Sequence, residues 1–270
     1  MKTRIIAGAA VVIVLAVLLL FAPNGVVALV VGLMAAVGSY ELLYATGLQK
    51  HVRLNIYSAV MAFAVTLWSC SGRNYALALI GLLVYYGLLF GEIMASHTKL
   101  LFKDVMLCMI SGVVIPFLLS ALVRIIILEN GRYLIYIPLI MAFFSDTGAY
   151  FVGVTCGKHK MAPIISPKKS WEGFFGGIAT AVIGMMLYAL LLERAFHLEV
   201  NYAAALVYGL VGALSAVFGD LTLSAVKRQV GIKDYGNLIP GHGGILDRFD
   251  SVMITAPLAE ALLLLLPIVV

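Results

Sequence analysis

The sequence contains few charged residues. Asp, Glu, Lys and Arg make up only 11% of its 270 residues, whereas 63% are hydrophobic. A soluble domain carries roughly 25% charged residues, so this chain has too little polar surface to coat a water-soluble globule. Its length is therefore not a count of soluble domains, because a bilayer is the expected solvent for most of the chain.

Cysteine is also scarce and follows no pattern. Cys70, Cys108 and Cys156 lie far apart in the sequence. An odd number of cysteines without CxxC spacing excludes a disulfide framework and a cysteine zinc site. We interpret the three as small packing residues among helices. The net charge of +5 is attributed to membrane topology and not to nucleic-acid binding.

Long apolar runs dominate what is present. A helix that crosses the bilayer core needs roughly 20 apolar residues. On that criterion the sequence predicts an all-α, polytopic integral membrane protein with about nine transmembrane helices. The expected spans are about 5–22, 25–46, 54–70, 75–95, 105–128, 133–154, 173–192, 202–226 and 249–269. We expect the first span to be a retained helix, because no small-x-small cleavage site follows it.

The positions of Lys and Arg predict the orientation. All but four of the 18 fall on the side that holds the N-terminus; the exceptions are Arg73, Arg124, Arg132 and Arg194. The positive-inside rule then puts the N-terminus and the loops 155–172 and 227–248 in the cytoplasm. Residues 1–130 are expected to form an apolar N-terminal region of about five spans, and 131–270 a catalytic membrane region that contains both loops.

The eighth span carries a polar stripe. Asp220, Ser224 and Lys227 are spaced i, i+4 and i+7, so they share one face of a helix. If Lys227 marks the interface, Asp220 lies about 10 Å deeper in the membrane. A carboxylate at that depth is costly and usually functional. The alternative is a structural Asp paired with a buried Arg.

Two further carboxylates lie at the start of the ninth span. Asp247 and Asp250 are three residues apart, which would place them on one face of the first helical turn. Either could also be an N-cap or a partner of the helix dipole. The nearby glycines 243 and 244 allow a close backbone approach to a ligand. Asp220 and Asp247 together would suit Mg²⁺, which prefers a few oxygen ligands with room for phosphate oxygens.

Other polar residues gather in the two long loops. His242 could donate to a phosphate oxygen or could simply be solvated; it lacks partners for a zinc site. Asp146 lies in the cytoplasmic half of the sixth span. Lys168 and Lys169 precede the seventh span, with Ser170 as its candidate N-cap. Two lysines at a helix N-terminus form an anion site, although positive-inside charge alone also explains them.

The remaining acids and glycines within the spans are best explained by packing. We interpret Glu41, Glu92 and Glu260 as hydrogen-bond partners between helices. The glycines interpreted as close-packing residues are Gly32, Gly81, Gly112, Gly209 and Gly212.

Taken together, the polar residues resemble a known signature. The sequence is similar to phosphatidate cytidylyltransferases (CDP-diacylglycerol synthases) over about 145–250, whereas 1–130 match only in being apolar. Every defined position agrees in the run Ser224-x-Val226-Lys227-Arg228-(x4)-Lys233-Asp234-x-Gly236-(x2)-Ile239-Pro240-x-His242-Gly243-Gly244-Ile245-x-Asp247-Arg248-Phe249-Asp250. The segments 145–150 and 166–173 also resemble that family. One departure is Val154, where a basic residue is expected; Lys158 or Lys160 could replace it.

The resemblance implies a metal-dependent nucleotidyltransferase that makes CDP-diacylglycerol and pyrophosphate from CTP and phosphatidate. It implies an integral protein of the bacterial cytoplasmic (inner) membrane, with the active site facing the cytoplasm. Mg²⁺ is the expected cofactor; a second ion and a homodimer are left open. The expected catalytic residues are Asp220, Asp247, Lys227, Arg228 and His242. The expected substrate-binding residues are Asp146, Ser166, Lys168, Lys169, Ser170, Ser224, Lys233, Gly243, Gly244 and Arg248. The expected metal ligands are Asp220, Asp247 and Asp250.

A second hypothesis comes from another class of protein. Intramembrane acids and glycine-interrupted helices are typical of ion- or proton-coupled transporters. Against this, the acids cluster toward one face and no inverted repeat is visible. A lipid kinase or phosphatase would need a nucleotide loop or a His nucleophile constellation, and neither is present.

Overall fold

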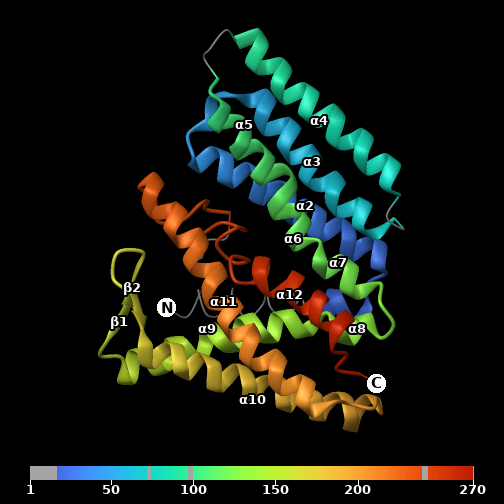
Figure 1. Cartoon of the computed structure of the whole chain (residues 1–270), viewed down its shortest axis with the longest axis vertical. Coiled ribbons are helices and arrows are strands. Elements are labelled where there is room, and N and C mark those ends of the chain that lie inside the picture. Colours follow the sequence, from blue (N-terminus) through green and yellow to red (C-terminus); the bar gives the residue numbers. More distant parts are fainter. Residues whose placement is uncertain (1–16, 72–73, 97–99, 239–242, 270) are drawn as a thin grey trace. The chain divides into compact units, whose positions relative to one another are not determined.

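The computed structural model describes residues 17–71, 74–96, 100–238 and 243–269 (Figure 1). Within these ranges, seven helical segments are long and apolar enough to cross a bilayer. They are Asn24–Ala45, Val52–Cys70, Tyr75–Ser96, Phe102–Ile126, Gly131–Cys156, Trp171–Phe196 and Tyr202–Val230. The protein is therefore a helical integral membrane protein. Most of the first expected span lies outside the described residues, and the last apolar helix, Val252–Leu265, is shorter. The count of nine and the N-terminal orientation thus stay predictions.

The chain divides into two compact units. The first comprises residues 1–129 with 232–248, and the second comprises 130–231 with 249–270. The first contains α2 (Asn24–Ala45), η1 (Leu48–Lys50), α3 (Val52–Cys70), α4 (Tyr75–Ser96), α5 (Phe102–Met109), the π-helix η2 (Ile110–Val114), α6 (Ile115–Leu119) and α7 (Ala121–Ile126). The second contains α8 (Gly131–Leu134), α9 (Tyr136–Cys156), β1 (Lys160–Ala162), β2 (Ser166–Ser170), α10 (Trp171–Phe196), α11 (Tyr202–Val230) and α12 (Val252–Leu265).

The first unit consists of packed helices whose core contains a small group of hydrogen-bonded polar atoms. Helix α2 packs on α3, and α3 contacts α4 and the π-helical turn η2 (Figure 1). Tyr85 is 3% exposed among apolar side chains that include Leu89 and Val105. Its hydroxyl lies 2.8 Å from Ser58 Oγ and donates to the Cys108 carbonyl at 2.7 Å. The buried phenol thus has the partners that a buried polar group needs.

Arg124 is a charged residue within the fifth expected span, and its contacts explain how the span accommodates it. Its guanidinium donates to Ser120 Oγ at 2.6 Å, to Ser69 Oγ at 3.3 Å and to the Phe117 carbonyl at 3.2 Å. It also lies 4.5 Å from the centre of the Phe117 ring. A buried cation is tolerated when hydrogen bonds replace its water, and these supply them.

In the second unit, helices α9, α10, α11 and α12 pack against one another (Figure 1). Glycines allow the close approaches. A Cβ at Gly177 on α10 would lie 2.8 Å from the Ser145 carbonyl oxygen on α9, and one at Gly209 on α11 would lie 2.6 Å from Val182 Cα on α10. Both obstacles are backbone atoms, which cannot rotate away.

Four of the five glycines interpreted as packing residues are confirmed, because a Cβ at Gly32, Gly112, Gly209 or Gly212 would lie 2.9 Å or less from another residue. The interpretation of Gly81 is wrong: no described atom lies within 4 Å of a Cβ built there. Gly81 lies on α4, and only 11% of this span is buried by the rest of the described chain. The face of α4 that contains Gly81 is therefore not covered by another helix among the described residues.

Gly209→Val is therefore expected to destabilise the protein while Gly81→Val does not. The first change forces a side chain into the α10 backbone, and such overpacking costs roughly 1–3 kcal/mol. The second makes the same change in helix propensity without a steric conflict. Thermal unfolding in detergent measures both variants; equal melting temperatures would contradict the packing argument.

The loop expected at 155–172 contains a β-hairpin that the all-α prediction did not include. Strands β1 and β2 pair antiparallel, with Lys160 opposite Ser170 and Ala162 opposite Ser166. Ser170 ends β2 and caps α10, accepting a hydrogen bond from Gly173 N at 3.2 Å, so its prediction as an N-cap is confirmed.

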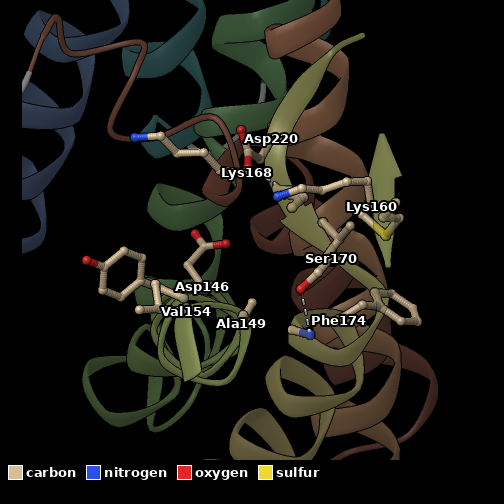
Figure 2. Close-up of a pocket in the computed structure, with 14 residues that line it drawn as sticks. Asp146, Ala149, Val154, Lys160, Lys168, Ser170, Phe174 and Asp220 are labelled. Carbon is tan, nitrogen blue, oxygen red and sulfur yellow. Dashed lines mark hydrogen bonds and ion pairs between the residues drawn. The ribbon is translucent and has the colours of Figure 1, made fainter. Parts of the chain in front are cut away.

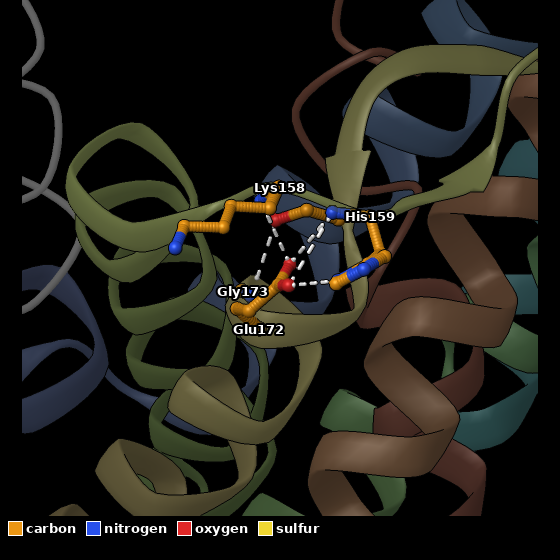
Figure 3. Close-up of polar contacts among 5 residues, drawn as sticks. Lys158, His159, Glu172 and Gly173 are labelled. Atoms are coloured by element: carbon orange, nitrogen blue, oxygen red, sulfur yellow. Dashed lines mark hydrogen bonds and ion pairs between the residues drawn. The ribbon is translucent and has the colours of Figure 1, made fainter.

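Glu172 fastens the start of this hairpin to α10 (Figure 3). Its carboxylate accepts hydrogen bonds from the backbone N–H groups of Lys158 and His159, at 3.1 and 3.2 Å, and lies 2.6 Å from His159 Nδ1. A carboxylate in the first turn of a helix is also favoured by the helix dipole. The hairpin is therefore held at both of its ends by the N-terminus of α10.

The segment 227–250 also differs from expectation. Helix α11 continues to Val230 and ends at Gly231, whose φ of 77° suits glycine. Lys227 and Arg228 thus lie in the last helical turn and not in a loop. Helix α12 begins only at Val252, so the prediction that Asp247 and Asp250 share its first turn is wrong. Both residues precede the helix. Asp247 accepts hydrogen bonds from a loop backbone instead of lying in a helical turn.

Candidate active site

The polar stripe predicted on α11 is present in the second unit. Ser224 Oγ donates to Asp220 Oδ1 at 3.0 Å, one helical turn along. Asp220 Oδ2 lies 2.5 Å from Lys169 Nζ on β2. The two side chains of this ion pair are 25% and 19% exposed, so solvent screens their attraction only partly. The cation that partners Asp220 therefore comes from the hairpin.

A cavity of about 510 Å³ opens beside this ion pair, within the second unit. Its polar lining comes from the two carboxylates and the hairpin: Asp146, Asp220, Lys160, Lys168, Lys169 and Ser170. Its apolar lining comes mainly from α9 and α10 and includes Tyr150, Val154 and Phe174. Figure 2 shows Asp146 and Asp220 projecting from α9 and α11 into the space that the hairpin lysines face. Such a cavity suits a molecule with an anionic head and an apolar body.

Two further acids, Asp146 and Asp250, lie near Asp220. Asp146 Oδ2 accepts a hydrogen bond from Ser251 Oγ at 3.0 Å. Asp250, next in the chain, interacts electrostatically with Asp220, Asp146 and the buried Lys227. Three carboxylates, those of Asp146, Asp220 and Asp250, therefore lie near one another, with Lys169 paired to Asp220 and Lys227 interacting with Asp250. Carboxylate oxygens grouped in this way are ligands of the kind that a divalent cation prefers.

No three Asp, Glu, His or Cys side chains converge on one point anywhere in the described ranges. Mg²⁺ commonly takes only one or two protein carboxylates and completes its shell with water and phosphate oxygens, so it does not need such a cluster. The carboxylates of Asp146 and Asp220, which line the cavity, are of the ligand type that fits Mg²⁺.

Other predicted site residues take different places. Arg228 Nε donates to the Ile165 carbonyl at 3.1 Å and so ties the hairpin to α11. Ser166 is half-buried on β2 but does not line the cavity. Lys233 and Arg248 are exposed residues of the first unit. His242 lies outside the described residues.

Of the two lysines considered as replacements for a basic residue at Val154, only Lys160 lines the cavity, as does Val154 itself. Lys158 contributes its backbone N–H to Glu172. The cavity therefore has a basic side chain close to the position where the family resemblance predicts one.

Asp247 belongs to a separate constellation in the first unit. Its Oδ2 accepts hydrogen bonds from Tyr235 N at 2.7 Å and Gly244 N at 3.1 Å, and the residue is 5% exposed. Gly243 has a φ of 83°, and a Cβ there would lie 3.0 Å from the same oxygen. Backbone at two places in the described signature segment, at Tyr235 and at Gly244, thus binds the Asp247 carboxylate.

Comparison with known proteins shows the family of this chain. The family model described as the Cytidylyltransferase family matches residues 2–266. The chain belongs to that family.

Curated relatives carry a more specific name. The phosphatidate cytidylyltransferase of Mycobacterium bovis is 39% identical over 165 residues, which cover 61% of this chain and 52% of that protein. Those of Staphylococcus epidermidis and Staphylococcus aureus are 44% and 42% identical over 136 residues, half of each chain. The matched part thus spans about half the length of these relatives.

Proposed function

We propose that this protein transfers CMP from CTP to phosphatidate, giving CDP-diacylglycerol and pyrophosphate, with Mg²⁺ as cofactor. The observation that carries the proposal is the cavity of the second unit, where the Asp220–Lys169 pair and further lysines meet apolar helix walls. CTP and the lipid phosphate are both polyanions, and the lysines offset their repulsion. The relatives' name points to the same pair of substrates. Neither the family nor the cavity supports the transporter alternative.

The chemistry requires no strong general base. A phosphate monoester has its second pKa at about 6, so the lipid phosphate is already ionised near neutral pH. One of its oxygens attacks the α-phosphorus of CTP, the bond from that phosphorus to the bridging oxygen breaks, and pyrophosphate leaves. Catalysis therefore reduces to positioning and charge neutralisation.

The residues divide this work by charge. Lys160, Lys168 and Lys169 would bind phosphate oxygens at the cavity. Asp220, with Asp146 and Asp250 near it, would hold Mg²⁺, and the family resemblance also predicts a catalytic role for Asp247 of the first unit. When bound, the ion would neutralise phosphate oxygens and orient the leaving pyrophosphate. The apolar lining would take the glycerol and the first part of the acyl chains, which reach the cavity through the bilayer.

A labelling experiment with purified protein in mixed micelles tests the function. With phosphatidate and Mg²⁺, label from the α-phosphate of CTP should enter the lipid, whereas label from the γ-phosphate should not. Removing the metal with a chelator should stop incorporation. Diacylglycerol, which lacks the attacking phosphate, should not accept label. Lipid labelled from the γ-phosphate would indicate a kinase, and no incorporation of either label would overturn the proposal.

The proposed orientation puts the hairpin and the cavity on the cytoplasmic side of the bacterial inner membrane, since CTP is cytosolic. A variant that retains Cys156 as its only cysteine tests this, because Cys156 is exposed next to the hairpin. We expect an impermeant maleimide to leave Cys156 unlabelled in intact cells and to label it after permeabilisation. A cysteine-free variant with Glu129→Cys, placed on the predicted outer side, should be labelled in intact cells. Labelling of Cys156 before permeabilisation would contradict the orientation.

A further inference from the structure

Glu41, in the middle of α2, makes contacts that a packing residue does not need. It is 6% exposed. Its Oε1 accepts a hydrogen bond from Ile245 N at 3.0 Å, and its Oε2 accepts one from Leu246 N at 2.9 Å. The donors lie 204 and 205 residues further along the chain, in the loop that ends at Asp247. Both carboxylate oxygens are therefore used to hold backbone in the first unit.

The glycines of this loop fit the same carboxylate. A Cβ added at Gly236 would lie 2.5 Å from Glu41 Oε1, and one at Gly244 would collide with both carboxylate oxygens. The backbone at Gly236 and the backbone at Gly244 thus both lie directly against Glu41. Side chains at these glycines would push the loop away from α2.

Asp247 binds backbone groups of the same loop to which it belongs. It accepts the N–H groups of Tyr235 and Gly244, while Glu41 accepts those of Ile245 and Leu246. Two buried carboxylates therefore bind four backbone N–H groups of one short segment. Because Ile245 and Leu246 directly precede Asp247, the position of Asp247 depends on the bonds to Glu41.

We propose that Glu41 is a positioning residue: it fixes the backbone of Ile245 and Leu246 so that Asp247 is correctly placed for the reaction. The catalytic part of this inference rests on the proposed function. It also gives the N-terminal region, which the family model covers but which carries none of the signature residues, a specific task. Charged hydrogen bonds in a buried setting are strong, and their loss leaves backbone donors unsatisfied.

Glu41→Gln tests the proposal, since glutamine keeps the shape but offers one acceptor and places an NH₂ against the other backbone N–H. Hydrogen exchange should show protection of the Ile245 and Leu246 amides falling about tenfold or more. In the CMP-transfer assay, kcat should fall by at least a similar factor, while the KM for CTP stays nearly unchanged. The Mg²⁺ concentration that gives half-maximal activity should rise. Glu92→Gln is the matched control, because Glu92 is an acid of the same unit that pairs only with Arg53 and Tyr57 among the contacts described. It should match wild type in every measurement.

Gly236→Ala provides a second route that leaves Glu41 in place, and it should reproduce the loss of amide protection and the fall in kcat. Unchanged protection in both variants would overturn the inference, as would lost protection with normal kcat. If wild type and Glu92→Gln also fail to transfer CMP, the proposed function is wrong, and the exchange pattern alone then decides whether Glu41 positions the loop.

Discussion

Asp220→Asn is expected to lower the rate of CMP transfer by about two to three orders of magnitude, the usual effect of removing one preorganised electrostatic group. The carboxamide keeps the size of the side chain and can still accept from Ser224 Oγ. It removes the charge that pairs with Lys169 and that would bind Mg²⁺. Lys169 then has no counter-ion at the cavity. It could still bind a phosphate group, but no metal ion would neutralise the rest of the phosphate charge.

The measurement is turnover over a range of Mg²⁺ concentrations, together with thermal unfolding to confirm that the variant folds. Glu193→Gln serves as the control for loss of one negative charge. Glu193 lies near the far end of α10 and accepts a hydrogen bond from Tyr202, so this change should leave turnover intact. Near-normal activity of Asp220→Asn at every Mg²⁺ concentration would show that the metal assignment is wrong.

Lys169→Gln is expected to have the second-largest effect, and a much larger one than Lys168→Gln. Lys169 is mostly buried and forms the ion pair with Asp220, whereas Lys168 is exposed at the edge of the cavity. Removing one partner of a partly buried pair leaves the other charge uncompensated. Lys169→Gln should therefore lower kcat by about a hundredfold. An exposed cation contributes less, so Lys168→Gln should raise the KM for one substrate only a few-fold.

These two variants change neighbouring residues of the same strand in the same way, so each is a control for the other. Steady-state kinetics with CTP and phosphatidate varied separately give the comparison. Equal and slight effects of both variants would indicate that the lysines serve only as positive-inside charge. That result would also remove the reason for placing the triphosphate beside the hairpin.

The sequence alone was sufficient for features that depend on local pattern. Apolar runs of helical length predicted the membrane helices, because each span must satisfy its own backbone within the bilayer. Helical periodicity predicted that Asp220 and Ser224 share a face, and they are hydrogen bonded. The local N-cap preference of serine identified Ser170. The signature from Ser224 to Asp250 indicated the family that the comparison then showed.

The tertiary structure alone decided which distant residues meet. No periodicity distinguishes Lys169 from Lys168; the pairing of β2 with β1 and its position beside α11 select Lys169 as the partner of Asp220. Asp247 and Asp250 looked like one helical pair, but the backbone bonds of Asp247 keep it in a loop of the first unit. Glu41 looked like any acid in an apolar helix, since its partners lie more than 200 residues away. Such contacts depend on how helices and loops pack, and local sequence preferences do not encode that packing in a readable form.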